Sequence, residues 1–324
     1  MTRRYSKMLV TGGAGFIGSH LVDHLLKKNM EVTVVDNLSF GNIENIRHHR
    51  NREGFHFVKG DIRDVRLVKR LVKGVEVVFH EAALASILLS VQDPIFANDV
   101  NVTGTLNLLK AAADCGVRRF VFASSAAVYA ETSPLEKREE GPLDPKSPYG
   151  VSKLAGENYA KAFYELYGLE TVSLRYFNVY GPRQRVDLNG QYGSVITIFL
   201  NRLLRNMSPR VFGDGEQTRD FVYVKDVVQA NMLAMTSKSA VGDCFNVGTG
   251  TRISINHVAQ ALKDAINKKD IKNVHTDPIP GEVKHGCADI SKARRILNYA
   301  PSVSFDEGLK DLVDWYTSNL QLSV

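Results

Sequence analysis

The sequence has few cysteines and no long hydrophobic run, and both shortages narrow the classes of protein it can encode. Its 324 residues include only three cysteines, without the spacing of a zinc site. Such an odd, sparse set predicts free thiols in a reducing compartment. No apolar stretch approaches the roughly 18 residues that a membrane-spanning helix needs. The basic N-terminus runs directly into a glycine loop that cleavage of a signal peptide would destroy, so we expect a cytoplasmic protein without a membrane partner.

The chain also lacks a strong charge of one sign. Its net charge is only +6, and its contents of 44% hydrophobic and 23% charged residues are typical of globular proteins. Basic residues are scattered apart from short clusters such as Lys268-Lys269, so we expect no nucleic-acid partner. A mildly positive protein suits an anionic small molecule in a cleft. The length suggests about two domains.

What the sequence does contain is a glycine-rich turn in an informative context. Residues 11–18 run Thr-Gly-Gly-Ala-Gly-Phe-Ile-Gly after the apolar run Met8–Val10, and a second apolar run, Val32–Val35, ends in Asp36. Strand, glycine turn, helix, second strand and terminal acid together are typical of a dinucleotide-binding βαβ unit. A lone glycine motif would be a much weaker indication.

Each part of this unit has a physical role. Two glycines let the backbone turn tightly and approach a pyrophosphate, and the third, Gly18, lets the helix pack closely. The free N–H groups and the positive dipole end of that helix attract phosphates. Asp36 would accept hydrogen bonds from the adenosine ribose hydroxyls and would repel a 2′-phosphate. No arginine follows it closely, so the sequence predicts NAD rather than NADP.

Strands and helices alternate along the first half of the chain. We expect strands that end near Asp36, Asp61, Ala83 and Ser125, a further strand near Thr171–Arg175, and helices at Asn101–Ala113 and Tyr149–Tyr167. This alternation predicts an α/β fold with a Rossmann-type, doubly wound parallel sheet that binds ligands at the carboxyl ends of its strands. We expect residues 1–180 to form this domain. Residues 181–324 should form mainly a smaller mixed α/β domain for substrate, with some segments returning to the Rossmann core.

The motif that indicates catalysis is Tyr149-Gly-Val-Ser-Lys153. Its tyrosine and lysine occupy positions i and i+4, which share one face of a helix. A lysine charge about 5 Å from a phenol, at an effective dielectric constant near 20, favours the phenolate by roughly 3 kcal/mol, or about two pKa units. We therefore expect a lowered pKa for Tyr149, lowered further by an oxidised nicotinamide, which would make it a usable base. Tyr-x-x-x-Lys is common by chance; its weight here comes from the glycine loop and from Ser125 at a predicted strand end.

These motifs resemble those of the extended short-chain dehydrogenase/reductase superfamily, and within it the nucleotide-sugar 4-epimerases, along essentially the whole chain. The resemblance implies a catalytic triad of Ser125, Tyr149 and Lys153, bound NAD, and reversible epimerisation at C4 of a UDP-hexose through a transient 4-keto sugar. It also implies a homodimer that uses two helices, including Asn101–Ala113 and Tyr149–Tyr167. The cofactor contacts it implies are Gly12, Gly15, Phe16, Ile17, Gly18, Asp36, Asn37, Ser39, Gly41, Asp61, Ile62, Ala82, Ala83, Tyr149, Lys153 and Tyr176.

Later motifs resemble the family's substrate segments. The segments are Arg175–Pro182, Gly213–Phe221 and Pro280-Gly281-Glu282. The implied UDP-sugar contacts are Ser86, Ser125, Asn178, Arg219, Glu282 and Gly286, with no metal. In related epimerases a small residue at the last of these positions accompanies N-acetylated sugars, so Gly286 predicts UDP-GlcNAc and UDP-GalNAc as substrates as well as, or in preference to, UDP-glucose and UDP-galactose. Two departures, Ile279 and Leu89, replace arginines that family members often carry.

Alternative functions would require different residues at these positions. A dehydratase or decarboxylase of this superfamily carries an acid shortly after the catalytic serine or threonine, where this chain has Ala126 and Ala127. A non-enzymatic NAD-sensing regulator would keep the glycine loop without the triad. A simple alcohol or amino-acid dehydrogenase would not need Arg219 and Glu282. We expect His80 to be a core residue rather than a base and Arg175 to form a structural ion pair.

Overall fold

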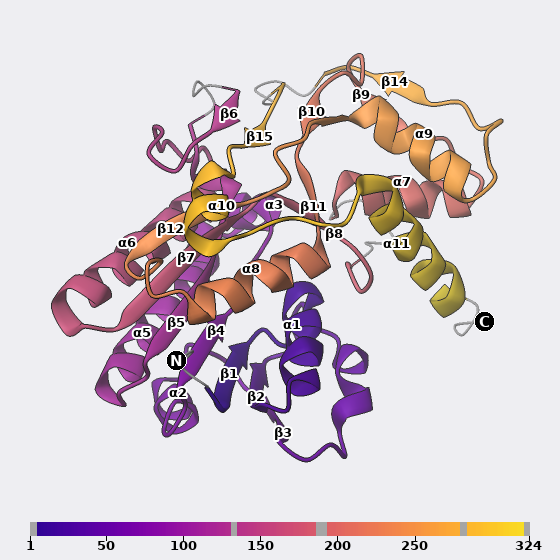
Figure 1. The fold of residues 1–324 in the computed structure, drawn as a ribbon. Helices are drawn as coiled ribbons and strands as arrows, with labels where there is room; N and C mark the ends of the chain where they lie inside the picture. The colour runs from indigo at the N-terminus through magenta and orange to yellow at the C-terminus, as the bar shows by residue number, and fades with distance from the viewer. Residues whose placement is uncertain (1–4, 131–134, 186–192, 279–283, 321–324) are drawn as a thin grey trace.

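A seven-stranded parallel sheet forms the centre of the molecule in the computed structural model, which describes residues 5–130, 135–185, 193–278 and 284–320 (Figure 1). The strand order is β12-β7-β5-β4-β1-β2-β3. The strands are β1 (Lys7–Thr11), β2 (Glu31–Asp36), β3 (Phe55–Lys59), β4 (Val77–His80), β5 (Arg119–Ser125), β7 (Glu170–Tyr176) and β12 (Asp243–Val247). The order reverses at β1 and β4, where a doubly wound sheet places its ligand.

Helices cover both faces of this sheet and create two separate cores. Alternate strand residues face opposite sides, so Val10 packs in one core and its neighbour Leu9 in the other. The first core contains buried residues of α1 (Phe16–Lys27), α8 (Val224–Thr236) and α10 (Ser291–Leu297). The second contains those of α2 (Val65–Leu71), α5 (Gly104–Asp114) and α6 (Pro148–Tyr167). Burial on both faces explains why these strands are nearly continuous apolar runs.

A third core lies beside the sheet, in the part of Figure 1 that holds α7, α9 and α11. These helices are α7 (Val195–Leu204), α9 (Ile255–Ala265) and α11 (Phe305–Leu320). Short strands complete this part in pairs: β8 (Asn178–Tyr180) with β11 (Phe221–Tyr223), β9 (Arg210–Phe212) with β14 (Val274–Thr276), and β10 (Thr218–Arg219) with β13 (Ile253–Ser254). A further pair joins β6 (Glu136–Lys137) to β15 (Cys287–Ala288).

The predicted Rossmann-type parallel sheet is confirmed, with local differences from the expected elements. The helix expected at Asn101–Ala113 begins earlier, because α4 (Pro94–Asn98) continues through a π-helical turn (Asp99–Thr103) into α5. The loop after Ala83 contains a short helix, α3 (Ile87–Gln92). Among the described residues, no helix is both long and apolar enough to cross a membrane.

Candidate active site

The glycine turn between β1 and α1 can be occupied only by residues with almost no side chain. Gly12 has a φ of +67°, and a Cβ atom there would lie 2.7 Å from the backbone nitrogen of Ala82. A Cβ on Gly18 would lie 2.3 Å from the carbonyl oxygen of Gly12. Gly15 is the N-cap of α1, and no side chain caps that helix end. The turn therefore leaves helix N–H groups available to a pyrophosphate, which fits the predicted dinucleotide.

Asp36 ends β2 as a buried carboxylate with acceptor capacity to spare. Its Oδ2 accepts a hydrogen bond from the backbone N–H of Ala14 at 3.0 Å and its Oδ1 from that of Leu38 at 2.8 Å. Burial raises the pKa of this carboxyl group, which these hydrogen bonds oppose. A carboxylate offers about four acceptor sites, so room remains for ribose hydroxyls. A Cβ on Gly41 would lie 2.7 Å from Oδ2, which explains a glycine there.

Asp61 follows β3 and interacts with a residue that the sequence analysis did not single out. Arg63 contacts both of its carboxylate oxygens, at 3.0 and 2.8 Å, and Asn37 donates to Oδ2 at 3.1 Å. The hydrogen bond from Arg63 lowers the pKa of Asp61 to about 2. Ile62 is buried under Gly104, where a Cβ would lie 2.6 Å from the Ile62 Cδ1 atom. Asn37 and Ser39 are exposed beside this carboxylate, joined by a hydrogen bond of 2.7 Å.

The structure brings Ser125, Tyr149 and Lys153 together at the carboxyl edge of the sheet. Ser125 is the last residue of β5, and its side chain hydrogen-bonds Tyr149 in the first turn of α6. Lys153, one turn later, donates from Nζ to the carbonyl oxygen of Ala123 at 2.8 Å. Its Nζ lies 5.9 Å from the centroid of the Tyr149 ring. A hydroxyl, a phenol and an ammonium group therefore share one partly buried site.

The predicted lowering of the Tyr149 pKa is wrong for the protein side chains taken alone. Burial raises this pKa, the hydrogen bond with Ser125 opposes the rise, and the charge of Glu81 adds to it. Burial also lowers the pKa of Lys153 to about 8. The lysine charge is visible in the sequence, whereas the cost of burying a phenolate depends on the folded surroundings of Tyr149.

Two further residues at this site escaped the sequence analysis. Ser90, fully buried in α3, accepts a hydrogen bond at Oγ from the backbone N–H of Tyr149 at 3.0 Å. It supplements Ser147, the N-cap of α6, whose Oγ accepts from the N–H of Gly150. Glu81 follows β4 and accepts a hydrogen bond from the hydroxyl of Tyr176 at 2.8 Å. Glu81 could have been identified as a candidate site residue from the sequence, because it directly follows a predicted strand. No feature of the sequence indicated Ser90.

Three of the residues expected to contact substrate lie on neighbouring segments. Asn178 donates from its backbone and side-chain nitrogens to the carbonyl oxygen of Asp220, at 3.0 and 3.1 Å, next to Arg219. The N–H of Gly286 donates to the carbonyl oxygen of Thr218 at 3.3 Å, on the other side of Arg219 in the chain. A Cβ on Gly286 would meet no atom of the described residues within 4 Å, so this position borders open space in the described part of the chain.

The other expected substrate residues are placed less directly. Ser86 is the N-cap of α3, accepting from the N–H of Leu89 at 3.2 Å, and Leu89 is half-buried in that helix. Glu282 and Ile279 lie outside the described residues. Ser86 therefore has a structural task, and its contact with substrate remains a prediction.

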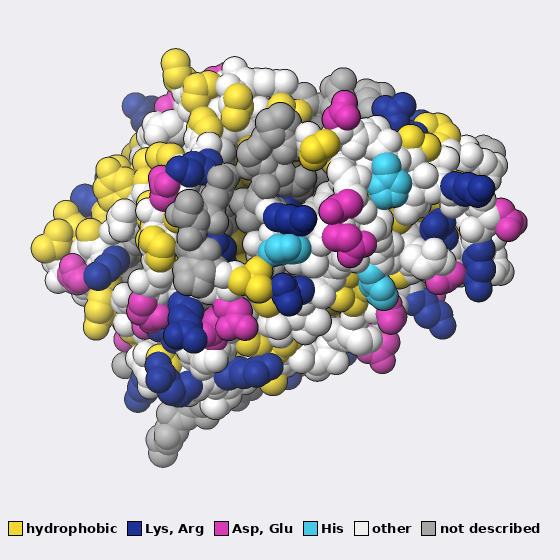
Figure 2. Space-filling view, turned by 90° about the horizontal axis from the view of Figure 1, so that it is seen from above, with side chains coloured by type: hydrophobic (Ala, Val, Ile, Leu, Met, Phe, Trp, Pro, Cys, Tyr) yellow, Lys and Arg dark blue, Asp and Glu magenta, His cyan; other side chains and the backbone are white. Residues whose placement is uncertain are grey.

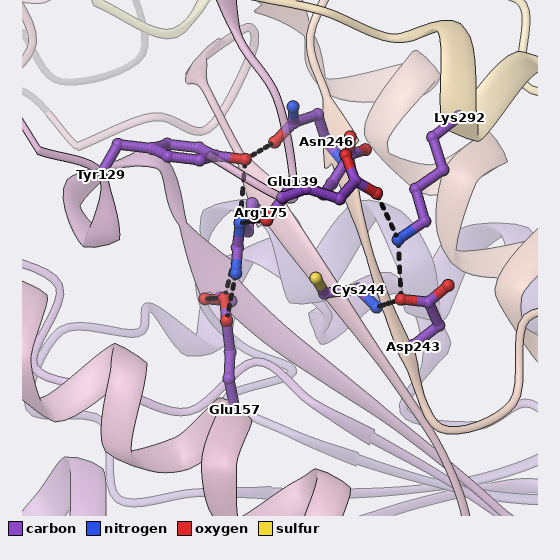
Figure 3. Close-up of polar contacts among 10 residues, drawn as sticks. Tyr129, Glu139, Glu157, Arg175, Asp243, Cys244, Asn246 and Lys292 are labelled. Carbon is purple, nitrogen blue, oxygen red and sulfur yellow. Dashed lines mark hydrogen bonds and ion pairs between the residues drawn. The ribbon is translucent and has the colours of Figure 1, made fainter. Parts of the chain in front are cut away.

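Arg175 forms the expected structural ion pair. Its guanidinium group donates to both carboxylate oxygens of Glu157, at 2.9 and 2.8 Å, and both side chains are buried (Figure 3). It also donates to the hydroxyl of Tyr129, which in turn donates to Asn246 in β12 at 2.5 Å. This network joins α6 to two strands of the sheet.

His80 is the core residue that the sequence predicts. It is 1% exposed, and its two ring nitrogens hydrogen-bond the hydroxyls of Thr11 and Thr105 at 2.7 and 2.8 Å. Burial lowers its pKa to about 3. A neutral imidazole with both nitrogens engaged is not available as a base.

The described residues contain one group with the spacing of metal ligands, and it lies outside the predicted site residues. The ligand atoms of Asp23, His48 and His49 lie within 4.8 Å of one another. Both histidines approach the same carboxylate oxygen, at 3.0 and 2.7 Å, and Arg183 pairs with the other at 2.8 Å. The carboxylate thus already has a cationic partner.

Comparison with known proteins identifies the family. A family model described as "NAD dependent epimerase/dehydratase family" matches residues 8–248. This chain belongs to that family. A putative UDP-glucose 4-epimerase from Methanocaldococcus jannaschii is 44% identical over 314 residues, covering 96% of this chain and 99% of the relative.

Solved structures agree with this assignment. A UDP-N-acetylglucosamine 4-epimerase from Methanobrevibacter ruminantium, in complex with UDP-N-acetylmuramic acid, matches with a TM-score of 0.92 and 39% identity over 98% of this chain and 100% of the other. A UDP-glucose 4-epimerase from Thermotoga maritima, with UDP-glucose, matches with a TM-score of 0.89 and 40% identity over 97% and 99%. The family and the fold are therefore shown together.

Proposed function

We propose that this chain is an NAD-dependent UDP-sugar 4-epimerase, an isomerase that interconverts the two configurations at C4 of a UDP-hexose. The observation that carries the proposal is the hydrogen-bonded pair Ser125–Tyr149, with Lys153 one helical turn away, at the same sheet edge as the glycine turn. Ligands of doubly wound sheets bind at this edge. We assign cofactor binding mainly to residues 1–180 and substrate binding mainly to residues 181–324.

Each catalytic residue has a defined task. Tyr149, as phenolate, takes the proton of the sugar 4-hydroxyl and later returns it, while Ser125 donates a hydrogen bond to the reacting oxygen. Lys153 supplies a positive charge that favours the phenolate form of Tyr149 and holds the nicotinamide ribose. The glycine turn and Asp36 would hold NAD, which would supply reversible hydride transfer at C4 of the sugar. No net oxidation results.

The residues expected to contact substrate support a nucleotide sugar as the ligand. They leave room for a substituent at C2 of the sugar. Arg219 and Asn178 would contact the diphosphate, and Glu282 the uridine ribose. The open space at Gly286 would accommodate a 2-acetamido group. We therefore propose UDP-GlcNAc and UDP-GalNAc as substrates, alongside or in preference to UDP-glucose and UDP-galactose.

The purified protein should be incubated with these four sugars and the products identified by NMR. We expect epimers of both acetylated substrates. Gly286→Tyr should lose activity on UDP-GlcNAc while keeping it on UDP-glucose, because the new ring would fill the open space. An equal loss on both sugars, or a wild type inactive on acetylated sugars, would contradict the assignment of Gly286. Release of a dehydrated product from these sugars, or loss of the carboxylate from an added UDP-sugar acid, would favour the alternative reactions of the superfamily.

Those alternatives have less support in the site. Ala126 and Ala127 form a 3₁₀ turn directly after Ser125, so that turn contributes no acidic side chain for an elimination. A non-enzymatic NAD-sensing regulator would have no use for the pairing of Ser125 with Tyr149. Among these functions, epimerisation is therefore the one that best accounts for Ser125, Tyr149 and Lys153 together.

We also propose a cytoplasmic homodimer. The three cysteines are unpaired, as expected in a reducing compartment. Exposed hydrophobic side chains gather at the left of Figure 2, the side on which α6 lies in Figure 1. The exposed large hydrophobic residues of α3, α4 and α6 include Ile87, Leu88, Val91, Ile95, Val151, Tyr159, Leu166 and Tyr167. A patch of this kind is typical of an interface.

A further inference from the structure

Glu81 lies where the catalytic ammonium group is anchored. It directly follows β4, whose last residue, His80, pairs with Phe122 of β5. In parallel register the next residue, Glu81, therefore lies beside Ala123. The carbonyl oxygen of Ala123 accepts the hydrogen bond from Lys153 Nζ at 2.8 Å. The strand order thus places a carboxyl group next to the point that holds the lysine.

A hydrogen bond from Tyr176 holds this carboxyl group in place, and a second hydrogen bond orients Tyr176. Tyr176 ends β7, on the other side of β5 from β4, so its side chain reaches across the end of β5 to donate to Glu81 Oε1 at 2.8 Å. Asn231 of α8 donates to the Tyr176 hydroxyl at 2.7 Å. Tyr176 is also a predicted contact of the cofactor. The carboxyl group is therefore held by elements on both sides of the catalytic strand.

The titratable groups that act on Glu81 come from two elements. Burial raises its pKa to about 7, against the opposing effects of the Tyr176 hydroxyl from β7 and the Lys153 charge from α6. Glu81 in turn raises the pKa of Tyr149 and of Lys153. The neighbouring His80 is directed to Thr11 and Thr105 instead. Glu81 is thus linked electrostatically to both titratable members of the triad.

We propose that Glu81 is a positioning residue of this site, a counter-charge that keeps Lys153 protonated and determines the pH range in which Tyr149 exchanges its proton with the sugar. This assignment rests on the proposed epimerase function. Glu81 touches no reacting atom in this account, and acts through Lys153 and Tyr149. The signature of the role is a displaced pH profile, which the loss of a merely structural contact would not produce.

The test compares two substitutions at opposite ends of one strand. Glu81→Gln removes the charge but leaves a carbonyl oxygen that can accept the Tyr176 hydrogen bond. Glu76→Gln removes the same charge just before β4, where Glu76 pairs with Arg118. In Glu81→Gln the alkaline limb of the kcat profile, above the Glu81 pKa of about 7 where this carboxyl is ionised, should move to lower pH by about one unit. That is the scale of one charge several ångströms away in a partly buried site. Glu76→Gln should leave the limbs in place.

A second readout does not depend on turnover. In protein carrying glutamate labelled for NMR at the carboxyl carbon, the Glu81 carboxyl should titrate well above the ordinary value of about 4.3. Burial also raises the pKa of Glu139, so the Glu81 signal is the one that vanishes in Glu81→Gln and persists in Glu76→Gln. Glu81→Asp, which keeps the charge, should return the alkaline limb of the kcat profile toward its wild-type position.

The possible outcomes distinguish a failure of the role proposed for Glu81 from a failure of the proposed epimerase function. An active Glu81→Gln enzyme with an unmoved alkaline limb overturns the proposal, and so does a Glu81 carboxyl that titrates near the ordinary value. If Glu81→Gln is too inactive for a profile, the proposal requires Glu81→Asp to be active, and an inactive Glu81→Asp overturns it. If the wild type epimerises no UDP-sugar, the proposed function fails, and the role assigned to Glu81 fails with it even where the carboxyl titrates as expected.

Discussion

Tyr149 is the residue on which the proposed chemistry depends. Tyr149→Phe removes the proton acceptor and keeps the aromatic packing, so turnover should fall at least 100-fold, within the range that a general base contributes. NAD should remain bound, as mass analysis of the extracted cofactor would show. Tyr159→Phe is the matched control, since Tyr159 lies on an exposed part of the same helix. A Tyr149→Phe enzyme that turns over at the wild-type rate would exclude Tyr149 as the base.

Asp36 predicts the identity of the cofactor. Its buried carboxylate is held by two backbone N–H groups and would repel a 2′-phosphate. The following residues, Asn37 and Ser39, are exposed but uncharged and cannot compensate. Cofactor extracted from the purified protein should therefore be NAD by mass. NADP as the main species would overturn this assignment.

At the scale of single residues, the sequence predicted which residues form the site more readily than it predicted their protonation states. The glycines and Asp36 could be recognised because backbone geometry and charge restrict those positions to few residue types. The direction of the Tyr149 pKa was mispredicted, because it depends on burial by residues far apart in the chain. Glu81 illustrates the same limit, since its effect comes from a hydrogen bond with β7 and an electrostatic interaction with α6.

At the scale of elements, α6 is positioned by a buried ion pair. Tyr149, Lys153 and Glu157 are spaced i, i+4 and i+8 along this helix, and Glu157 pairs with Arg175 of β7. Arg175→Met should lower the free energy of unfolding by about 3–5 kcal/mol, because it leaves the Glu157 carboxylate buried without its partner. Urea denaturation monitored by circular dichroism measures this loss.

The control for this prediction is a pair on the surface. Arg138 contacts Asp289 at 3.0 Å, but the Arg138 side chain is 69% exposed. Arg138→Met should therefore change the free energy of unfolding by less than about 1 kcal/mol. Equal losses in the two variants would show that the Arg175–Glu157 pair contributes no more than an exposed one.

The long elements were predictable from sequence and the short ones were not. Strands such as β5 are buried on both faces, and the resulting apolar runs are visible in the sequence. The two-residue strands β10 and β15 carry no such pattern, since tertiary pairing alone defines them. The same holds for α3, which places Ser90 under the first turn of α6.

At the scale of the whole molecule, the substrate side is assembled from distant segments. Asn178, Arg219 and Gly286 become neighbours through β8, β11 and β10 and the segment that follows the undescribed residues 279–283. No local periodicity predicts such proximity. In the sequence it was implied only by resemblance to nucleotide-sugar epimerases.

The distribution of exposed hydrophobic residues over the whole molecule predicts where two copies would associate. The resemblance to nucleotide-sugar epimerases implies an interface that includes Asn101–Ala113 and Tyr149–Tyr167. The exposed large hydrophobic residues of the described chain concentrate on α3, α4 and α6 rather than on α5. Ile95 of α4 is 77% exposed, which is unfavourable in water unless a partner covers it.

We expect the wild type to be a dimer by light scattering coupled to size-exclusion chromatography. Ile95→Glu should convert it to a monomer at micromolar concentration, because burying an unpaired carboxylate in an apolar interface is costly. Val274→Glu is the control, since Val274 is 47% exposed but belongs to β14, on the opposite side of Figure 1 from α6. A dimer that survives Ile95→Glu but dissociates in Val274→Glu would place the interface on the other side of the molecule.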